Sequence, residues 1–352
     1  MTEGFDFCNA RVESKSTNNC CYAFARNSSR YSKLKNISIM TTFNRVRHSQ
    51  SGFIRRMQMS QDRLWIMVEG LFDRAFYGRI CEANKSTQQC SYKICLPREL
   101  PDFTGDGKKP LLSMYKYLSM HKLLTSKFRG EKTSVLFLLD KDVDDLTRRR
   151  IRSKYVIYTE YYSADNYVFR FGDLCAALSS WSLLDIRSIK RQIGEDAIRW
   201  TENAATNWRR WVEHCILVAF LGIKGVPTFR TAGSLIHDGP YGNIKTAELS
   251  CLANLVMQKS GLTREQFEAT QEKIAAFVEN VYRKGAHDKI FNGKWYRKFL
   301  AKDAQLAAGG RQCCTRGSEE QLAQSLLVTL DYTSGWTDCF HRALDKAVLR
   351  LR

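Results

Sequence analysis

Short apolar runs alternate with amphipathic segments between residues 63 and 160. The runs at 64–68 and 134–139 are almost wholly apolar, and those at 91–96 and 155–159 are rich in aromatic and aliphatic residues. Such runs are typical of strands buried on both faces. The segments between them, which include 71–80, 111–128 and 142–153, are helical in pattern. This order predicts an α/β fold with a parallel sheet flanked by helices and right-handed crossovers.

A different pattern begins after residue 171, where long amphipathic helices are predicted. They cover 194–220, 246–259, 263–284, 319–330 and 337–349. Thr263 and Gln266 have the spacing of a capping box at the start of the third.

Three parts of the chain follow from these patterns. Residues 1–60 are polar and basic and form an N-terminal extension. Residues 61–180 form the α/β domain. Residues 181–352 form a mostly helical region that supplies a partner, dimer or substrate surface.

Composition narrows the function classes. The chain has 352 residues, of which 44% are hydrophobic, and this excludes an intrinsically disordered protein. Lys and Arg number 55 against 36 Asp and Glu, which gives a formal net charge of +19. Such a charge favours an anionic partner, either nucleic acid or an acidic membrane surface. A basic surface that only keeps the protein soluble is the alternative.

Neither the Cys and His spacing nor the apolar runs indicate a zinc site or a membrane span. The 12 Cys and six His contain no C-x-x-C and no H-x-x-x-H spacing, so a structural zinc site is not expected. The longest apolar run, 215–223, is far shorter than the roughly 20 residues of a membrane span. We therefore expect a cytoplasmic protein with reduced thiols and no membrane association.

Acidic residues follow three of the predicted strands. Glu69 comes directly after the first strand, and Asp73 follows four residues later. Asp140 and Asp142 follow the third strand, and Asp165 comes shortly after the fourth. Ligands of open parallel sheets bind beyond the carboxyl ends of the strands, and carboxylate oxygens select Mg²⁺ or Mn²⁺. Each acid taken alone can instead be a helix N-cap.

Basic residues lie close to these acids in sequence. Arg148, Arg149, Arg150 and Arg152 come shortly after Asp142. They can contact the phosphates of a nucleic acid beside a metal site, or they can be an ordinary solvated charge run.

Four segments together resemble a known fold. They are Val68–Tyr77 (VEGLFDRAFY), Phe137–Asp145 (FLLDKDVDD), Tyr158–Tyr167 (YTEYYSADNY) and the short Ile290–Lys294 (IFNGK). The first three, within residues 61–170, resemble the TOPRIM fold. More narrowly, they are similar to the TOPRIM nucleases of anti-phage defence, which are related to the OLD nucleases and are encoded beside ABC-type ATPases.

The resemblance implies a Mg²⁺-dependent (or Mn²⁺-dependent) endonuclease. Glu69 matches the TOPRIM glutamate, as a metal ligand or general base. It implies catalytic roles for Glu69, Asp140, Asp142 and Lys294. It implies a metal site formed by Glu69, Asp73, Asp140, Asp142 and Asp165, although Asp165 stands where the family usually has Glu. Lys294 would neutralise a phosphate oxygen, or it is a solvated surface lysine.

The resulting hypothesis is a toxic effector that cleaves RNA, with tRNA as one candidate, or DNA. A partner ABC-type ATPase would control it, and a homodimer is compatible with the helical region. The alternative is a non-catalytic subunit of a defence complex that binds nucleic acid or a metal ion. Primase- or topoisomerase-like chemistry is a third option. A topoisomerase, however, needs a nucleophilic tyrosine from a second domain, and the sequence identifies none.

Overall fold

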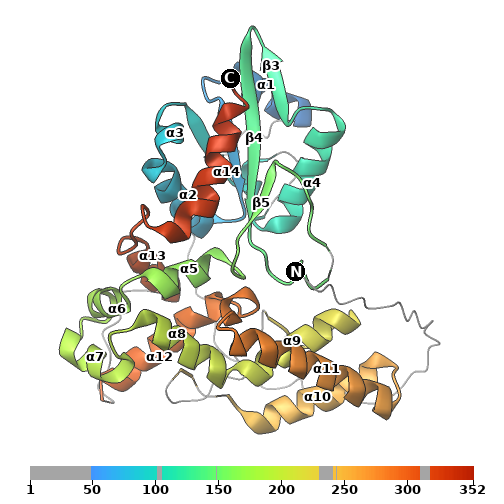
Figure 1. Ribbon diagram of the computed structural model, residues 1–352, viewed down its shortest axis with the longest axis vertical. Helices are drawn as coiled ribbons and strands as arrows, with labels where there is room; N and C mark the ends of the chain where they lie inside the picture. Colours follow the sequence, from blue (N-terminus) through green and yellow to red (C-terminus); the bar gives the residue numbers. More distant parts are fainter. Residues whose placement is uncertain (1–48, 101–104, 148, 230–240, 243, 310–317) are drawn as a thin grey trace, which may run out of the picture.

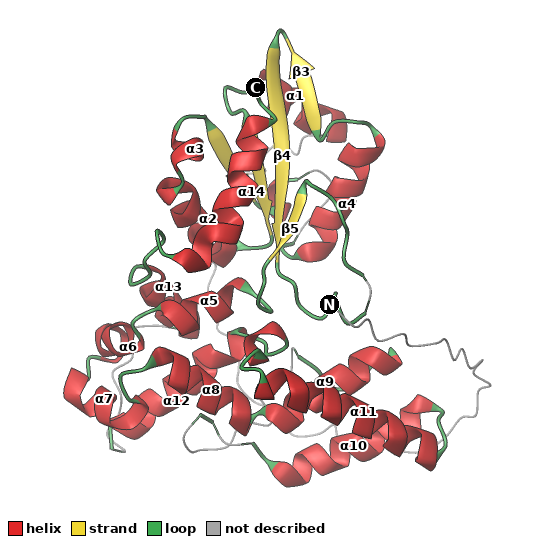
Figure 2. Cartoon of the chain, viewed as in Figure 1, coloured by secondary structure: helices red, strands yellow, loops and turns green. Residues whose placement is uncertain are grey.

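The computed structural model describes residues 49–100, 105–147, 149–229, 241–242, 244–309 and 318–352. An α/β half lies above a half made of helices alone (Figure 2). The first 48 residues of the predicted extension, and Arg148, lie outside the described residues. Within the described part, no helix is long and apolar enough to cross a membrane.

A five-stranded sheet forms the α/β half. Its strands are β1 (Leu64–Val68), β2 (Tyr92–Cys95), β3 (Thr125–Phe128), β4 (Glu131–Leu139) and β5 (Val156–Tyr158). Four of them are parallel in the order β2-β1-β4-β5, and β3 pairs antiparallel with the first half of β4. The predicted α/β class with a parallel sheet is therefore confirmed.

Strand β3 corrects the sequence prediction. A single helix was expected over 111–128, but α4 (Lys108–Met120) ends before β3 begins. Lys122 has a positive φ, which breaks the helix. Arg129 and Gly130 also have positive φ values, the backbone of a tight hairpin turn that returns the chain into β4.

The strand order changes side between β1 and β4. The chain leaves β1 toward β2 on one side, whereas β4 pairs with β1 on the other side. Val68 pairs with Leu138 in the parallel register, so the residues that follow these two strands are neighbours. This is the switch point at which open α/β sheets bind ligands.

Helices cover both faces of the sheet because the β1 side chains alternate between two cores. Leu64, Ile66 and Val68 pack on one face, and Trp65 and Met67 on the other. The first face is covered by α2 (Leu71–Ala83) and α14 (Asp338–Leu349), with the short α3 (Lys85–Gln88) nearby. The second face is covered by α1 (Gln50–Met59) and α4 (Figure 1).

Helix α14 returns to the α/β half from the end of the chain. Phe340 packs edge-on against Phe76 of α2, and Asn84 donates a hydrogen bond to Asp345 at 3.0 Å. The predicted boundary at residue 180 therefore separates α14 from the elements on which it packs.

The lower half contains the remaining long helices. They are α5 (Ala164–Phe171), α6 (Leu174–Ser182), α7 (Ile186–Ile193), α8 (Ala197–Asn207), α9 (Arg209–Leu221), α10 (Thr246–Ser260), α11 (Arg264–Arg283), α12 (Lys294–Ala307) and α13 (Glu319–Leu327). In the described part of the chain, short 3-10 turns at Pro97–Glu99, His287–Lys289 and Gly335–Thr337 lie between elements. The capping box at Thr263 is confirmed. The helix predicted over 194–220 is two helices that meet at Trp208.

The predicted helix over 142–153 is wrong. Residues 142–147 form turns, and the described residues from 149 to 152 have no regular structure. Asp142 has a φ of 50°, a left-handed conformation that no residue adopts within an α-helix. The acids after β4 therefore lie on a loop rather than in the first turn of a helix.

Candidate functional site

Two predicted site residues meet directly at the switch point. The Glu69 Oε1 atom, just beyond β1, accepts a hydrogen bond from the Asp140 backbone N–H, just beyond β4, at 2.9 Å. Asp140 is buried, and its Oδ1 atom accepts a hydrogen bond from the Ala164 N–H at 3.0 Å. That N–H is the first of α5, whose N-cap residue is Ser163, so Asp140 satisfies a free backbone N–H at this helix start without being its N-cap.

Burial and mutual repulsion raise the pKa values of this cluster. Desolvation raises the pKa of Glu69 to about 8, with Asp142 and Asp73 adding to the shift and Lys108 opposing it. Desolvation likewise raises the pKa of Asp73 to about 7. The pKa of Asp140 is raised well above its ordinary value, first by desolvation and then by the charges of Asp73 and Glu69. Such shifts are typical of carboxyl groups gathered in one poorly solvated place.

Lys294 is the first residue of α12 and belongs to the same electrostatic neighbourhood. The residue as a whole is exposed, yet its ammonium group lies where solvent is partly excluded. Desolvation lowers the pKa of Lys294, but attraction to Asp140, Asp165 and Asp73 outweighs it and leaves the pKa raised. The structure therefore brings Lys294 to the predicted acids from a distant part of the sequence.

Asp142 lies on the loop after β4 and is held by two contacts. Its N–H donates a hydrogen bond to the Tyr162 carbonyl at 2.9 Å. Its Oδ2 atom lies 2.5 Å from the Lys108 Nζ atom, which also contacts the Asp144 Oδ2 atom at 2.9 Å. Lys108 was not singled out from sequence.

Asp165, another predicted metal ligand, pairs with Arg297. It is 1% exposed in the first turn of α5. The Arg297 Nε atom donates to its Oδ1 atom at 2.6 Å. Arg297 also lies over the Phe72 ring, 4.6 Å from the centroid. In this arrangement the charge of Asp165 is compensated by Arg297, so the residue lies beside the other acids without being free for a metal ion.

A buried network fixes the start of α12 against the start of α5. Asn166 closes a capping box with Ser163 and donates to the Asp288 Oδ1 atom and to the Phe291 carbonyl, both at 3.0 Å. Asp288 also pairs with Arg170 at 2.9 Å. This network places the backbone that precedes Lys294.

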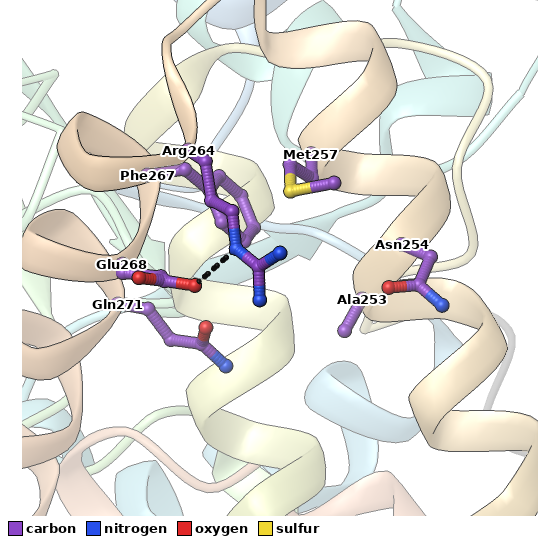
Figure 3. Close-up of a pocket in the computed structure, with 7 residues that line it drawn as sticks. All are labelled: Ala253, Asn254, Met257, Arg264, Phe267, Glu268 and Gln271. Atoms are coloured by element: carbon purple, nitrogen blue, oxygen red, sulfur yellow. Dashed lines mark hydrogen bonds and ion pairs between the residues drawn. The ribbon is translucent and has the colours of Figure 1, made fainter.

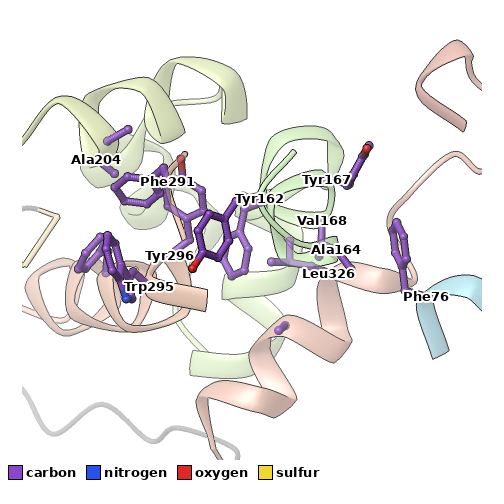
Figure 4. Packing of buried hydrophobic residues seen from close by; sticks show 14 of the residues in the cluster. Phe76, Tyr162, Ala164, Tyr167, Val168, Ala204, Phe291, Trp295, Tyr296 and Leu326 are labelled. Atoms are coloured by element: carbon purple, nitrogen blue, oxygen red, sulfur yellow. The ribbon is translucent and has the colours of Figure 1, made fainter. Parts of the chain in front are cut away.

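Aromatic packing surrounds the network. Tyr162, Tyr167, Phe291 and Tyr296 belong to one continuous cluster of buried residues that reaches from the sheet into the helical half (Figure 4). Trp200, Trp208 and Trp211 are also buried in this cluster. Because the two halves share this core, the Lys294 side and the strand-end side of the site are held in one body.

The basic segment borders the acid loop. Arg150 and Arg152 line a hollow of about 700 Å³ together with Asp144, Asp145, Ile151, Ser153 and Val156. Arg149, Arg150 and Arg152 are exposed. Arg150 stacks on the Tyr158 ring at 4.9 Å and contacts Asp145 at 3.2 Å. The structure thus places two of the four predicted arginines, Arg150 and Arg152, beside Asp144 and Asp145 of the loop after β4.

A second hollow, of about 210 Å³, lies between α10 and α11. Figure 3 shows its lining, in which Arg264 pairs with Glu268 at 2.8 Å beside Met257 and Phe267. None of the predicted site residues lines it.

The acids fit a hard divalent cation by chemistry but are not assembled into a cage. Within the described residues, no set of three or more His, Cys, Asp and Glu is placed to hold one metal ion. The donors are all carboxylate oxygens, the set that Mg²⁺ and Mn²⁺ prefer. A separate observation supports a polar ligand here. The Tyr77 hydroxyl is buried without a hydrogen-bond partner, and its pKa is raised by desolvation and then by Asp140, Asp73 and Glu69.

Tyr77, Lys108 and Arg297 are site residues that sequence reasoning missed. Tyr77 follows Asp73 by four residues on α2, so helical spacing alone places both side chains on one face. Lys108 carries no such signal, because its position depends on the loop that joins β2 to α4.

Comparison with known protein families found no family model that matches this chain, and a search of curated proteins found no matching sequence. The resemblance to TOPRIM nucleases therefore depends on the motif residues alone.

Proposed function

We propose that this chain is a metal-dependent TOPRIM-type nuclease that hydrolyses phosphodiester bonds in RNA, with tRNA as one candidate, or in DNA. The observation that carries the proposal is the meeting of Glu69 and Asp140 at the switch point of the sheet. Asp73 and Lys294 share their electrostatic environment.

The side chains are suited to phosphodiester hydrolysis. Glu69, Asp140 and Asp142 would hold Mg²⁺ or Mn²⁺, with Asp73 nearby. When bound, the ion would activate water and neutralise charge on the phosphoryl group. Lys294 would stabilise a phosphate oxygen as a fixed cation. Glu69, whose pKa is raised to about 8 by desolvation, can accept or hold a proton at its carboxylate near neutral pH.

The substrate would approach across the hollow beside the acid loop. Arg150 and Arg152 line it, and exposed arginines bind phosphates without reading sequence. The formal net charge of +19 would attract a polyanion to the acid cluster from a distance.

The resemblance to TOPRIM nucleases of anti-phage defence also suggests a cellular role. We place the protein in the cytoplasm, as the toxic effector of an anti-phage defence system. An ABC-type ATPase would restrain it until infection, and a homodimer is compatible with this arrangement.

The second candidate is a non-catalytic subunit that binds nucleic acid or a metal ion. It is favoured by the pairing of Asp142 and Asp144 with Lys108, which leaves no preformed metal cage in the described residues.

The experiment compares the full-length wild type with Glu69→Gln and Asp140→Asn. End-labelled tRNA, single-stranded RNA and duplex DNA are incubated with each protein and Mg²⁺ or Mn²⁺. We expect wild type to cleave one substrate class and both variants to lose activity by roughly 10²-fold or more. Glu160→Gln is the matched control, because Glu160 is an exposed acid just beyond β5. Equal cleavage by wild type and Glu69→Gln would rule out the proposed chemistry.

Growth provides the parallel test in cells. Expression of the wild type alone is expected to arrest growth and fragment the same class of nucleic acid, whereas Glu69→Gln does neither. Growth arrest by both forms, with the nucleic acids intact, would favour the non-catalytic candidate.

A further inference from the structure

Lys108 brings a positive charge to the loop after β4 that carries Asp142 and Asp144. It begins α4, and its Nζ atom contacts the Oδ2 atoms of Asp142 and Asp144 at 2.5 and 2.9 Å. The preceding residue, Gly107, donates its N–H to the Glu69 carbonyl at 2.8 Å. The residue before α4 is therefore hydrogen-bonded to the residue after β1. From the first position of α4, the Lys108 side chain contacts the loop after β4.

Lys108 and Asp144 are shielded from solvent, whereas Asp142 is partly exposed. The side chains of Lys108 and Asp144 are only 14% and 15% exposed, and the side chain of Asp142 is 36% exposed. The Lys108 ammonium also lies 5.8 Å from the centroid of the Tyr158 ring. The shielded Lys108–Asp144 pair is stronger than a surface pair, because little water competes for either charge, and it keeps the ammonium beside Asp142.

Hydrogen bonds hold the backbone of Asp142 in place. The Asp142 N–H is fixed to the Tyr162 carbonyl at 2.9 Å, and Tyr162 N–H in turn donates to the Asp288 carbonyl at 2.7 Å. A divalent ion that binds Asp142 must therefore compete with Lys108 for the same carboxylate.

We propose that Lys108 is a built-in cation that competes with the divalent metal ion for Asp142, so that metal binding requires this ion pair to open. The inference rests on the metal-dependent function proposed above. Lys108 acts here as a positioning residue, because it acts through its contacts with Asp142 and Asp144.

The test measures Mn²⁺ binding to the full chain without nucleic acid, by calorimetry and by the electron paramagnetic resonance signal of free Mn²⁺. Lys108→Met removes the competing charge, and we expect Mn²⁺ to bind on the order of tenfold more tightly. Lys108→Arg keeps the charge and is expected to bind Mn²⁺ as wild type does. Lys109→Met is the matched control, because Lys109 is the exposed neighbour on the same helix. Lys108→Gln replaces Lys108→Met if the latter does not fold.

A purely structural role for Lys108 predicts the opposite result. Loss of Lys108 would then lower stability and would leave Mn²⁺ affinity unchanged or weaker, which overturns the inference while the nuclease proposal stands. Tighter Mn²⁺ binding by Lys108→Met, together with no cleavage by wild type, would support the inference and refute the nuclease. Absence of Mn²⁺ binding in both wild type and Lys108→Met would overturn both.

Discussion

The Glu69 carboxyl group holds its proton far more tightly in the folded protein than in the unfolded chain. Its pKa rises from 4.5 to about 8, chiefly through desolvation. Between these values the unfolded state has lost a proton that the folded state keeps. The free energy of unfolding therefore falls as the pH rises through this window. Asp73, whose pKa rises from 3.8 to about 7 through desolvation, acts in the same direction.

The fall of the free energy of unfolding with rising pH can be tested with a single substitution at Glu69. In metal-free buffer, we expect the melting temperature of the wild type to fall between pH 5 and pH 8. Glu69→Gln should flatten this dependence, because the amide does not titrate but still accepts the Asp140 N–H. The measurement is a thermal melt at each pH, with Glu160→Gln as control. An identical slope for wild type and Glu69→Gln would contradict a buried, protonated Glu69.

We expect added Mg²⁺ to oppose this effect. A divalent ion bound at the acid cluster would replace its protons, so it should stabilise the wild type most above pH 7 and stabilise Glu69→Gln less. Equal stabilisation of both proteins at every pH would place the ion elsewhere.

At the level of elements, the contact between the starts of α5 and α12 determines where Lys294 lies. A Cβ atom on Gly293 would lie 2.6 Å from both the backbone N and the Oδ1 atom of Asn166. Gly293 has helical backbone angles, so its lack of a side chain serves this close approach rather than an unusual φ.

Gly293→Ala is therefore expected to destabilise the protein by about 1–3 kcal/mol, the usual cost of overpacking. It should also weaken Mg²⁺-dependent cleavage, because α12 must move away from α5 and carries Lys294 with it. Urea unfolding measures the first effect. Gly105→Ala is the control, since a Cβ there meets nothing within 4 Å. A Gly293→Ala variant as stable as Gly105→Ala would show that the two helix starts are not in tight contact.

The elements also show where sequence reasoning succeeds and fails. The apolar runs of β1 and β4 predict the central strands, and the acids that follow them predict the meeting of Glu69 and Asp140. These features are local, or follow from the rule that parallel strands end at one edge. Strand β3 was missed because its pairing depends on the turn at Arg129–Gly130. The helix predicted after β4 was wrong because a helical pattern in 142–153 says nothing of the fixed bond from Asp142 to Tyr162.

Of the site residues that are distant in sequence from the acids, some were predicted and others were not. Lys294 was proposed from a short Gly-Lys segment, whereas Arg297 and Lys108 were not singled out. Each of the latter is ordinary in its own sequence context. The roles of Arg297 beside Asp165 and of Lys108 beside Asp142 depend on contacts between segments more than thirty residues apart.

At the scale of the whole molecule, the charge predicts how nucleic acid binds. An exposed arginine that contacts one phosphate contributes about one unit to the slope of log affinity against log salt. In the Glu69→Gln background, Arg152→Ala should lower this slope by about one, whatever the sequence of the oligonucleotide. Fluorescence anisotropy over a series of KCl concentrations measures it.

Arg187→Ala is the matched control for this measurement. Arg187 is exposed on α7, away from the hollow that Arg152 lines. Equal slopes for Arg152→Ala and Arg187→Ala would mean that the hollow is not the path of the phosphate backbone.

The return of α14 to the sheet has a consequence for biosynthesis. During translation, β1 and Glu69 emerge from the ribosome first. Lys294 follows much later, and Phe340, which packs on α2, emerges last. Domains usually fold as they emerge, in order from the amino end. Here the acids, the lysine of α12 and the covering helix come together only when residues up to 349 are available. A toxic activity at this site would therefore be absent from nascent chains and from fragments that stop before α14.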